Sequence, residues 1–305
     1  MSDSAVMSKP VGSSEGFDED LQGVLATKDS LGAVLTKSGR YDEAEALLKE
    51  VLQIREGLGE SRTDKDMLRT LNNLGAVLGK QGRFSESEEL ARQVLASDEQ
   101  TLGSEHTDTI TSINNLADVL TRQDKLEEAE TLQRRALELS KQVRGPKHPD
   151  TLAVMSNLGD ILVRQRKYEQ AEAVSREALK LRQEVLRESH PEIASSMQNL
   201  AVALNKQAKF DEAEVLHRKG VALAQTDMDK MASMGDLARF LKGRGRYDEA
   251  EQLLQDVVKL STQAWGQDSR KTRSAMSQLG DVLIRNGKYQ EAEDMHRSIL
   301  WTSMA

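Results

Sequence analysis

The chemically most versatile side chains in this sequence are five histidines, and their spacing follows a repeat. His106, His148 and His190 stand 42 residues apart in one kind of turn, while His217 and His296 share another repeated position. None belongs to an HExxH or comparable metal-binding pattern, and the chain contains no cysteine. We therefore expect no metal site, no disulfide and no cofactor.

The sequence carries no recognisable catalytic motif. Gly243 and Gly245 lack the residues that surround a phosphate-binding or dinucleotide-binding loop. Serine and aspartate are plentiful, but they follow no spacing that would define a catalytic triad. We predict that the protein is not an enzyme and assign no catalytic residue.

An asparagine recurs immediately before a repeated leucine. Its amide offers two donors and one acceptor, which match the backbone groups of an extended peptide. Asparagine is unfavourable inside a helix, so its repetition needs a reason. We predict a peptide-binding role, and the alternative is that these amides tie adjacent helices together. The residues are Asn73, Asn115, Asn157 and Asn199.

A cation recurs six residues after the same leucine. A cation in the last turn of a helix stabilises the negative end of its dipole by about 0.3–1 kcal/mol, which is one explanation. Contact with a ligand is the other, and the two are compatible. Asp118, Asp160 and Asp281 lie four residues before cations of this set, so the surface is mixed in sign. The candidate ligand contacts are Lys80, Arg122, Arg164 and Lys206.

These residues must be positioned by a repeated pair of helices. The leucine is usually followed by Gly or Ala and, four residues later, by another apolar residue, which is the pattern of one helical face. A short turn and a stretch such as Tyr41-Asp42-Glu43-Ala44-Glu45 follow, and they predict a second, antiparallel helix. The spacing is 42 or 43 residues, except for one interval of 37. The repeated leucines are Leu31, Leu74, Leu116, Leu158, Leu200, Leu237 and Leu279.

The order of small and apolar residues resembles the tetratricopeptide repeat, whose usual period is about 34 residues. The additional residues fall after the second helix, where glycines such as Gly103 and Gly145 predict a helix end. We expect the acid in His148-Pro149-Asp150-Thr151 and similar turns to cap the next helix. This turn and the pair Asn114-Asn115 are similar to the kinesin light chain type of the repeat.

The resemblance implies an all-α, right-handed solenoid of about seven helix-turn-helix repeats over residues 19–305. Residues 1–18 are rich in serine and glycine and have no periodic apolar pattern, so we expect a disordered tail there. In that fold the first helices line a concave groove, so the asparagines and cations above would face a ligand. The implied function is that of a scaffold or adaptor that binds an extended peptide or short helix of a partner protein. The bound peptide would carry some acidic residues.

The net charge of −8 has a structural explanation. Acids of the second helix precede a cation by four residues, the favoured orientation, with about 0.2–0.5 kcal/mol for each pair. Since no basic stripe interleaved with aromatics is present, we exclude nucleic acid as a partner. No apolar run is long enough to span a membrane, and we expect a cytoplasmic protein. The pairs begin at Glu45, Glu88, Glu130, Glu172, Glu214 and Glu293.

A competing function is architectural. The array could associate with itself or regulate a larger assembly without any peptide ligand. The sequence near Ile299, Leu300 and Trp301 ends without an obvious polar capping helix, which terminal repeats normally require. This C-terminal end is therefore the predicted site of self-association.

Overall fold

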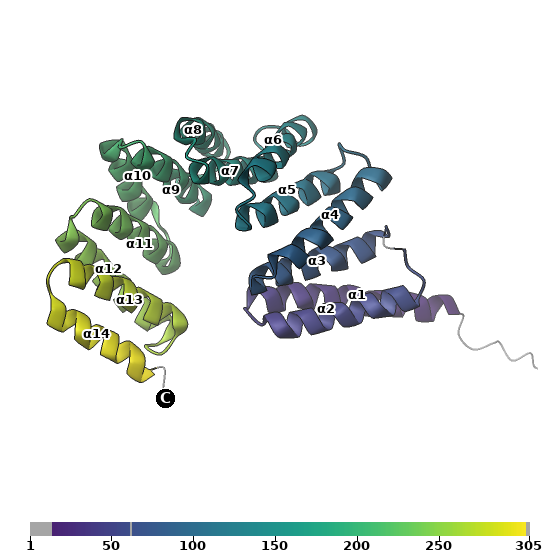
Figure 1. The fold of residues 1–305 in the computed structure, drawn as a ribbon, viewed down its shortest axis with the longest axis horizontal. Helices are drawn as coiled ribbons and strands as arrows, with labels where there is room; N and C mark the ends of the chain where they lie inside the picture. The colour runs from purple at the N-terminus through teal and green to yellow at the C-terminus, as the bar shows by residue number, and fades with distance from the viewer. Residues whose placement is uncertain (1–13, 62, 303–305) are drawn as a thin grey trace, which may run out of the picture. The chain divides into compact units, whose positions relative to one another are not determined.

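The computed structural model describes residues 14–61 and 63–302, and this part of the chain contains fourteen α-helices and no β-strand (Figure 1). It divides into two compact units, of which the first ends at Val143 and the second begins at Arg144. Helix α1 begins at Ser14, and residues 1–13 of the predicted tail lie outside the described residues.

Consecutive helices form antiparallel hairpins in both units (Figure 1). The first unit contains α1 (Ser14–Lys37), α2 (Tyr41–Gly57), α3 (Lys65–Gln81), α4 (Phe84–Thr101), α5 (Thr107–Arg122) and α6 (Leu126–Val143). The second unit contains α7 (Pro149–Arg164), α8 (Tyr168–Val185), α9 (Pro191–Lys206), α10 (Phe210–Leu223), α11 (Asp227–Gly243), α12 (Tyr247–Trp265), α13 (Arg270–Arg285) and α14 (Tyr289–Thr302). The predicted all-α repeat of helix hairpins is confirmed.

The small residue after the repeated leucine lets the two helices of a hairpin approach closely. At Gly280, a Cβ atom would lie only 2.6 Å from Nε2 of His296 on the second helix. At Gly75, the carbonyl accepts a hydrogen bond of 2.8 Å from the Ser87 hydroxyl. The repeated histidine at position 296 is therefore a packing residue of the hairpin.

The turn inside each hairpin requires a left-handed residue eight positions after the leucine. Glycine supplies it at Gly82, where φ is 83°, but Asp124, Arg166 and Ala208 adopt φ of 60–63° at the same position of their repeats. A side chain in this region is sterically unfavourable. The turn therefore keeps its left-handed backbone conformation even in repeats where the residue is not glycine.

The prediction that an acid caps the first helices is wrong, because the cap is the histidine two residues earlier. Nδ1 of His106, His148 and His190 accepts the backbone N–H of Asp108, Asp150 and Glu192 at 3.1–3.2 Å. The acids occupy the first helical turn, where their negative charge interacts favourably with the positive end of the helix dipole.

Burial of the repeated leucines reveals the exception at the start of the array. Six of them are at most 6% exposed, whereas Leu31 on α1 is 48% exposed. Val24 and Val34 on the same helix are also exposed. The leucine of the first repeat therefore differs from the others, because about half of its surface is exposed to solvent.

A half-buried or buried carboxylate on several second helices connects its hairpin to the next one. Glu88 on α4 accepts hydrogen bonds of 2.7 Å from Gln123 and from Lys125, both in the following repeat. It also forms the predicted pair with Arg92 at 2.9 Å. The same arrangement recurs at Glu45, Glu172 and Glu251. These acids do more than support their own helix, which was their predicted role.

The environment of three of these acids, Glu45, Glu88 and Glu172, lowers their pKa. Burial would raise the pKa of Glu172, but hydrogen bonds from Lys209, Arg176 and Gln207 outweigh it and lower that pKa to about 2. Glu45 and Glu88 also have a pKa of about 2. Because a lowered pKa means that folding favours the charged form, these contacts stabilise the array above pH 4.5 and lose their effect as the pH falls toward 2.

We expect Glu172→Gln to destabilise the second unit by about 1.5–3 kcal/mol at neutral pH, since it removes the charge that holds three donors. In urea denaturation the difference from wild type should shrink between pH 4.5 and 2, where the wild-type carboxylate becomes protonated. Glu212→Gln, which affects an exposed pair with Arg176, is the matched control and should change stability by about 1 kcal/mol or less. Equal effects of the two changes would contradict the connecting role of Glu172.

Candidate functional site

Several first helices of neighbouring hairpins contact one another. Within the first unit α1 contacts α3, and within the second unit α9 contacts both α7 and α11. Residues at one position of these successive first helices are therefore close in space. This arrangement gives the predicted asparagines and cations a common location within a unit.

A cavity of about 150 Å³ lies between α3 and α5, with α4 beneath it; we call it the groove cavity. Lys80, Asn115 and Arg122, three of the predicted site residues, line it. Gly75 and Gly79 also line it, and their lack of side chains leaves room above α4. The structure thus brings together an amide and two cations that come from two different repeats.

The groove cavity has mixed charge, as predicted. Lys80 and Arg122 are exposed, and Nε of Arg122 donates to Oδ2 of Asp118 at 2.9 Å. An exposed pair of this kind stabilises the protein by only about 0–1 kcal/mol, so a ligand carboxylate can compete for the guanidinium at low cost.

A second cavity, of about 450 Å³, adjoins the first and shares Asn72 with it. Asn73 lines this second cavity. Its Nδ2 atom also donates to the backbone carbonyl of Asp29 at 3.4 Å, so this asparagine ties α3 to α1. Asn73 therefore has the alternative role considered above, that of linking adjacent helices. It lines the second cavity as well.

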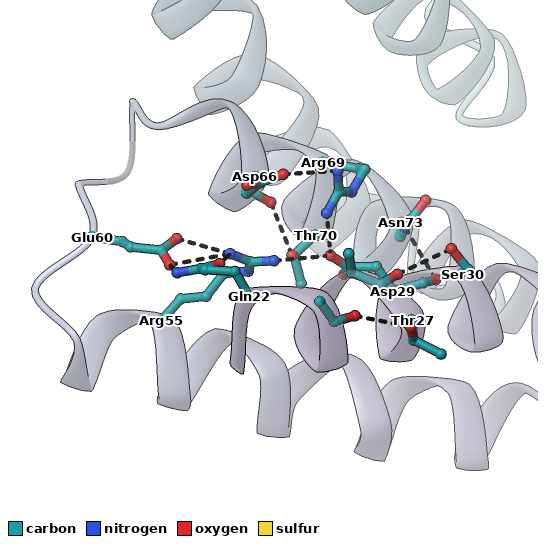
Figure 2. A network of polar contacts seen from close by, with 12 residues as sticks. Gln22, Thr27, Asp29, Ser30, Arg55, Glu60, Asp66, Arg69, Thr70 and Asn73 are labelled. Atoms are coloured by element: carbon teal, nitrogen blue, oxygen red, sulfur yellow. Dashed lines mark hydrogen bonds and ion pairs between the residues drawn. The ribbon is translucent and has the colours of Figure 1, made fainter. Parts of the chain in front are cut away.

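Asp29 belongs to a buried polar network that fixes α1, α2 and α3 together (Figure 2). Its carboxylate lies 3.4 Å from Arg55 and 3.2 Å from Arg69. Arg55 is fully buried and also pairs with Glu60 at 3.0 Å, while Gln22 contacts both Arg55 and Glu60. The network positions the start of α3 and, with it, Asn72 and Asn73.

In the second unit the predicted residues are less concentrated. Asn199 lines a cavity of about 260 Å³ between α9, α10 and α11, together with His217 and Asp236. Burial lowers the pKa of His217 to about 4 and raises the pKa of Asp236. His217 is therefore neutral at pH 7. Asn157, Arg164 and Lys206 are exposed on α7 and α9 and do not line this cavity.

The sequence did not single out several residues of these cavities. Asn72 lines both cavities of the first unit, although only its neighbour was predicted as a contact. Asp98 of the second cavity and Arg55 of the polar network around Asp29 are buried, and no sequence signal separated them from surface charges. Residues 14–61 and 63–302 contain no group of three or more potential ligands that could hold a metal ion. None of the described helices is both long and apolar enough to cross a membrane.

Comparison with known families matches this chain to the tetratricopeptide repeat over residues 23–100, 66–129, 108–184, 157–226 and 229–300. The chain belongs to the tetratricopeptide repeat family. No curated protein matches it in sequence.

Several solved structures share its fold. One is a kinesin light chain-type protein with nearly identical repeats from Podosopora anserina, with 24% identity, a TM-score of 0.60, and 65% of this chain and 93% of the other covered. BtubC from P. vanneervenii has 20% identity and a TM-score of 0.58, with 79% and 92% covered. The quorum sensor NprR from B. thuringiensis has 13% identity and a TM-score of 0.56, with 95% and 93% covered. The resemblance to kinesin light chain repeats is thus confirmed for the fold.

We expect Asp29→Ala to destabilise the first unit by about 3–5 kcal/mol, because it leaves the buried Arg55 without one of its two carboxylate partners. Hydrogen exchange should accelerate in α1, α2 and α3 before it accelerates in α5 and α6. Asp66→Ala removes an exposed partner of Arg69 and should cost about 1 kcal/mol or less. If Asp29→Ala is as mild as this control, the network does not hold the start of the array.

Proposed function

We propose that this protein is a non-enzymatic scaffold or adaptor that binds an extended segment of a partner protein along the groove between α3 and α5. The tetratricopeptide repeat is typically a protein-interaction module, and the groove cavity supplies the chemistry for peptide recognition. The proposal includes a cytoplasmic location and excludes membranes and nucleic acids as partners.

The observation that carries this proposal is the convergence of Lys80, Asn115 and Arg122 on one cavity. The Asn115 amide can donate to and accept from a peptide backbone, and the two cations can contact acidic side chains of the peptide. A peptide with both polar and acidic residues fits this surface better than a polyanion does, because Asp118 would repel a continuous run of negative charge.

The energetics require several contacts at once. A hydrogen bond to a charged group contributes about 1.5–3 kcal/mol, whereas ordering a disordered segment costs about 2–5 kcal/mol or more. Micromolar affinity corresponds to about −8.2 kcal/mol. The groove cavity alone does not reach that value, so the peptide must continue along neighbouring first helices. Asn73 lies on that path within the first unit.

A random peptide library selected on the full chain tests the proposal. We expect enriched peptides with acidic residues, and we expect Lys80→Glu combined with Arg122→Glu to weaken their binding by about tenfold or more. The loss should be smaller at high salt, since contacts of exposed charges are screened. Asn115→Ala should weaken binding with little dependence on salt.

The matched control reverses two exposed cations on second helices, Lys180→Glu with Lys259→Glu, and produces the same change in net charge. Arg164→Glu with Lys206→Glu shows whether the predicted cations of the second unit also take part. Peptides that bind all these variants as tightly as the wild type would exclude the first-helix surface as the binding site.

One observation favours the alternative, self-associating function. Val24, Leu31 and Val34 expose an apolar surface on α1, at the position where later repeats bury their leucine. The C-terminal edge predicted from Trp301 has its side chain outside the described residues, while Leu300 beside it is exposed. Sedimentation of the wild type and of Leu31→Glu over a wide concentration range distinguishes the two functions. A monomer at all concentrations contradicts self-association.

A further inference from the structure

The larger cavity of the first unit, next to the groove cavity, has a different chemical character. It lies where the starts of α3 and α5 meet the end of α4 and has a volume of about 450 Å³. Leu68 and Leu102 give it apolar walls, and Asn72, Asp98 and Ser112 give it polar ones. We call it the Asp98 cavity.

Asp98 is a buried carboxylate without a cationic partner. It is 3% exposed, and its Oδ2 atom accepts a hydrogen bond of 2.6 Å from the Ser112 hydroxyl. Among the described residues, no cation forms an ion pair with it. Burial raises the pKa of Asp98, and the Ser112 hydrogen bond only partly opposes this effect. Burying a carboxylate is costly unless a positive charge or further donors compensate it.

The same position carries an arginine in two other repeats. Asp98 lies 24 residues after its repeated leucine, and Arg55 and Arg182 lie 24 residues after theirs. The guanidinium of Arg182 donates to the hydroxyls of Ser156 and Ser196 at 3.0 and 2.8 Å. Ser196 corresponds in its repeat to Ser112, and Ser156 corresponds to Asn72. The fourth repeat therefore places its own guanidinium between these two positions.

In the second repeat this arrangement is reversed. Asp98 occupies the repeat position that Arg182 occupies in the fourth repeat. A cavity is present beside Asn72 and Ser112, the residues that correspond to the two serines contacted by Arg182. A guanidinium that enters from outside would meet the Asp98 carboxylate and the Asn72 side chain, while its methylene groups would contact Leu68 and Leu102. Long cationic side chains commonly bury their stems on apolar surface in this way.

The other charges at the cavity do not neutralise Asp98. Arg69 is already paired with Asp29 at 3.2 Å and with Asp66 at 2.7 Å. A positive charge on Lys65, which is exposed, or on His106, which also lines the cavity, reduces the attraction for a cation, while Asp108 increases it. Of the two carboxylates that line the cavity, Asp98 is the more buried, and an ion pair formed with it would be less screened by water.

We propose that the Asp98 cavity binds an arginine side chain of the partner peptide. This inference rests on the proposed function, because it assigns a second specificity pocket to the same peptide. An arginine is favoured over a lysine because its planar group can donate to the carboxylate and to a neighbouring amide at once. The peptide would thus carry an acidic residue over the groove cavity and an arginine at the Asp98 cavity.

The direct probe is N-acetyl-arginine amide, titrated into the full chain and followed by NMR. We expect saturable shifts confined to residues around the Asp98 cavity, and none with N-acetyl-citrulline amide, which has nearly the same shape without the charge. Asp98→Asn should raise the dissociation constant by about tenfold or more, since it removes the charge but keeps an acceptor for Ser112. Lys65→Gln should lower that constant.

Glu99→Gln is the matched control, because it removes one negative charge from the adjacent residue, which does not line the cavity. Equal shifts with arginine and citrulline amides would overturn the inference even if Asp98→Asn failed to fold. Unchanged arginine binding in a folded Asp98→Asn variant would also overturn it. N-acetyl-lysine amide binding as tightly as the arginine probe would contradict the choice of arginine.

The peptide library separates this inference from the proposed function. Enriched peptides without a recurring arginine, or with an arginine that Asp98→Asn leaves unaffected, would overturn the arginine pocket and leave the groove intact. If no peptide is enriched while the arginine probe binds as described, the groove function fails and the cationic site stands.

Discussion

A repeated leucine needs a neighbouring hairpin to cover it, because the two helices of one hairpin leave one side of that leucine open to water. Leu74 and Leu116 follow an earlier hairpin in the first unit and are 6% and 2% exposed, whereas Leu31 of the first hairpin is 48% exposed. At about 25 cal/mol for each Å² of apolar surface removed from water, this packing is the main stabilisation available to an array with so few aromatic residues. The contacts of a repeat are therefore chiefly with its immediate neighbours.

The polar contacts are organised on the same principle of neighbouring hairpins. The acids at Glu45, Glu88, Glu172 and Glu251 connect second helices to the turn of the next hairpin, so their negative charge is used in holding the array together. The cations at the ends of the first helices are exposed instead. Although the net charge is −8, the groove of the first unit can consequently present positive groups to a ligand.

Features that depend on sequence neighbours were predictable. The helix hairpins, the glycine-containing turns and the paired acids and cations four residues apart all follow from local spacing, and the structure confirms them. The convergence of Lys80, Asn115 and Arg122 also follows from the 42-residue period once the first helices are known to be adjacent. Their role in binding stays a prediction.

Features that depend on distant side chains were not predictable. The partners of Glu88 lie 35 and 37 residues away, and its sequence neighbours explain only the pair with Arg92. Arg55 looks like a surface residue in the sequence, but Asp29 and Glu60 allow it to be buried. The histidine caps were missed because an acid in the following turn is the commoner capping residue. In each case, burial and the direction of a side chain decided the outcome.

The connecting carboxylates have a consequence for how such an array can grow. In the second repeat, Glu88 on the second helix contacts the following repeat. Gln81 and Arg83, in the hairpin turn of the same repeat, contact Glu45 of the preceding repeat. A typical repeat thus carries one half of each of two complementary contacts. An in-frame duplication of that segment would therefore bring both complementary ends with it. The new copy would find matching groups on either side, so the length of the chain could change through gene duplication without any compensating substitution at the junctions.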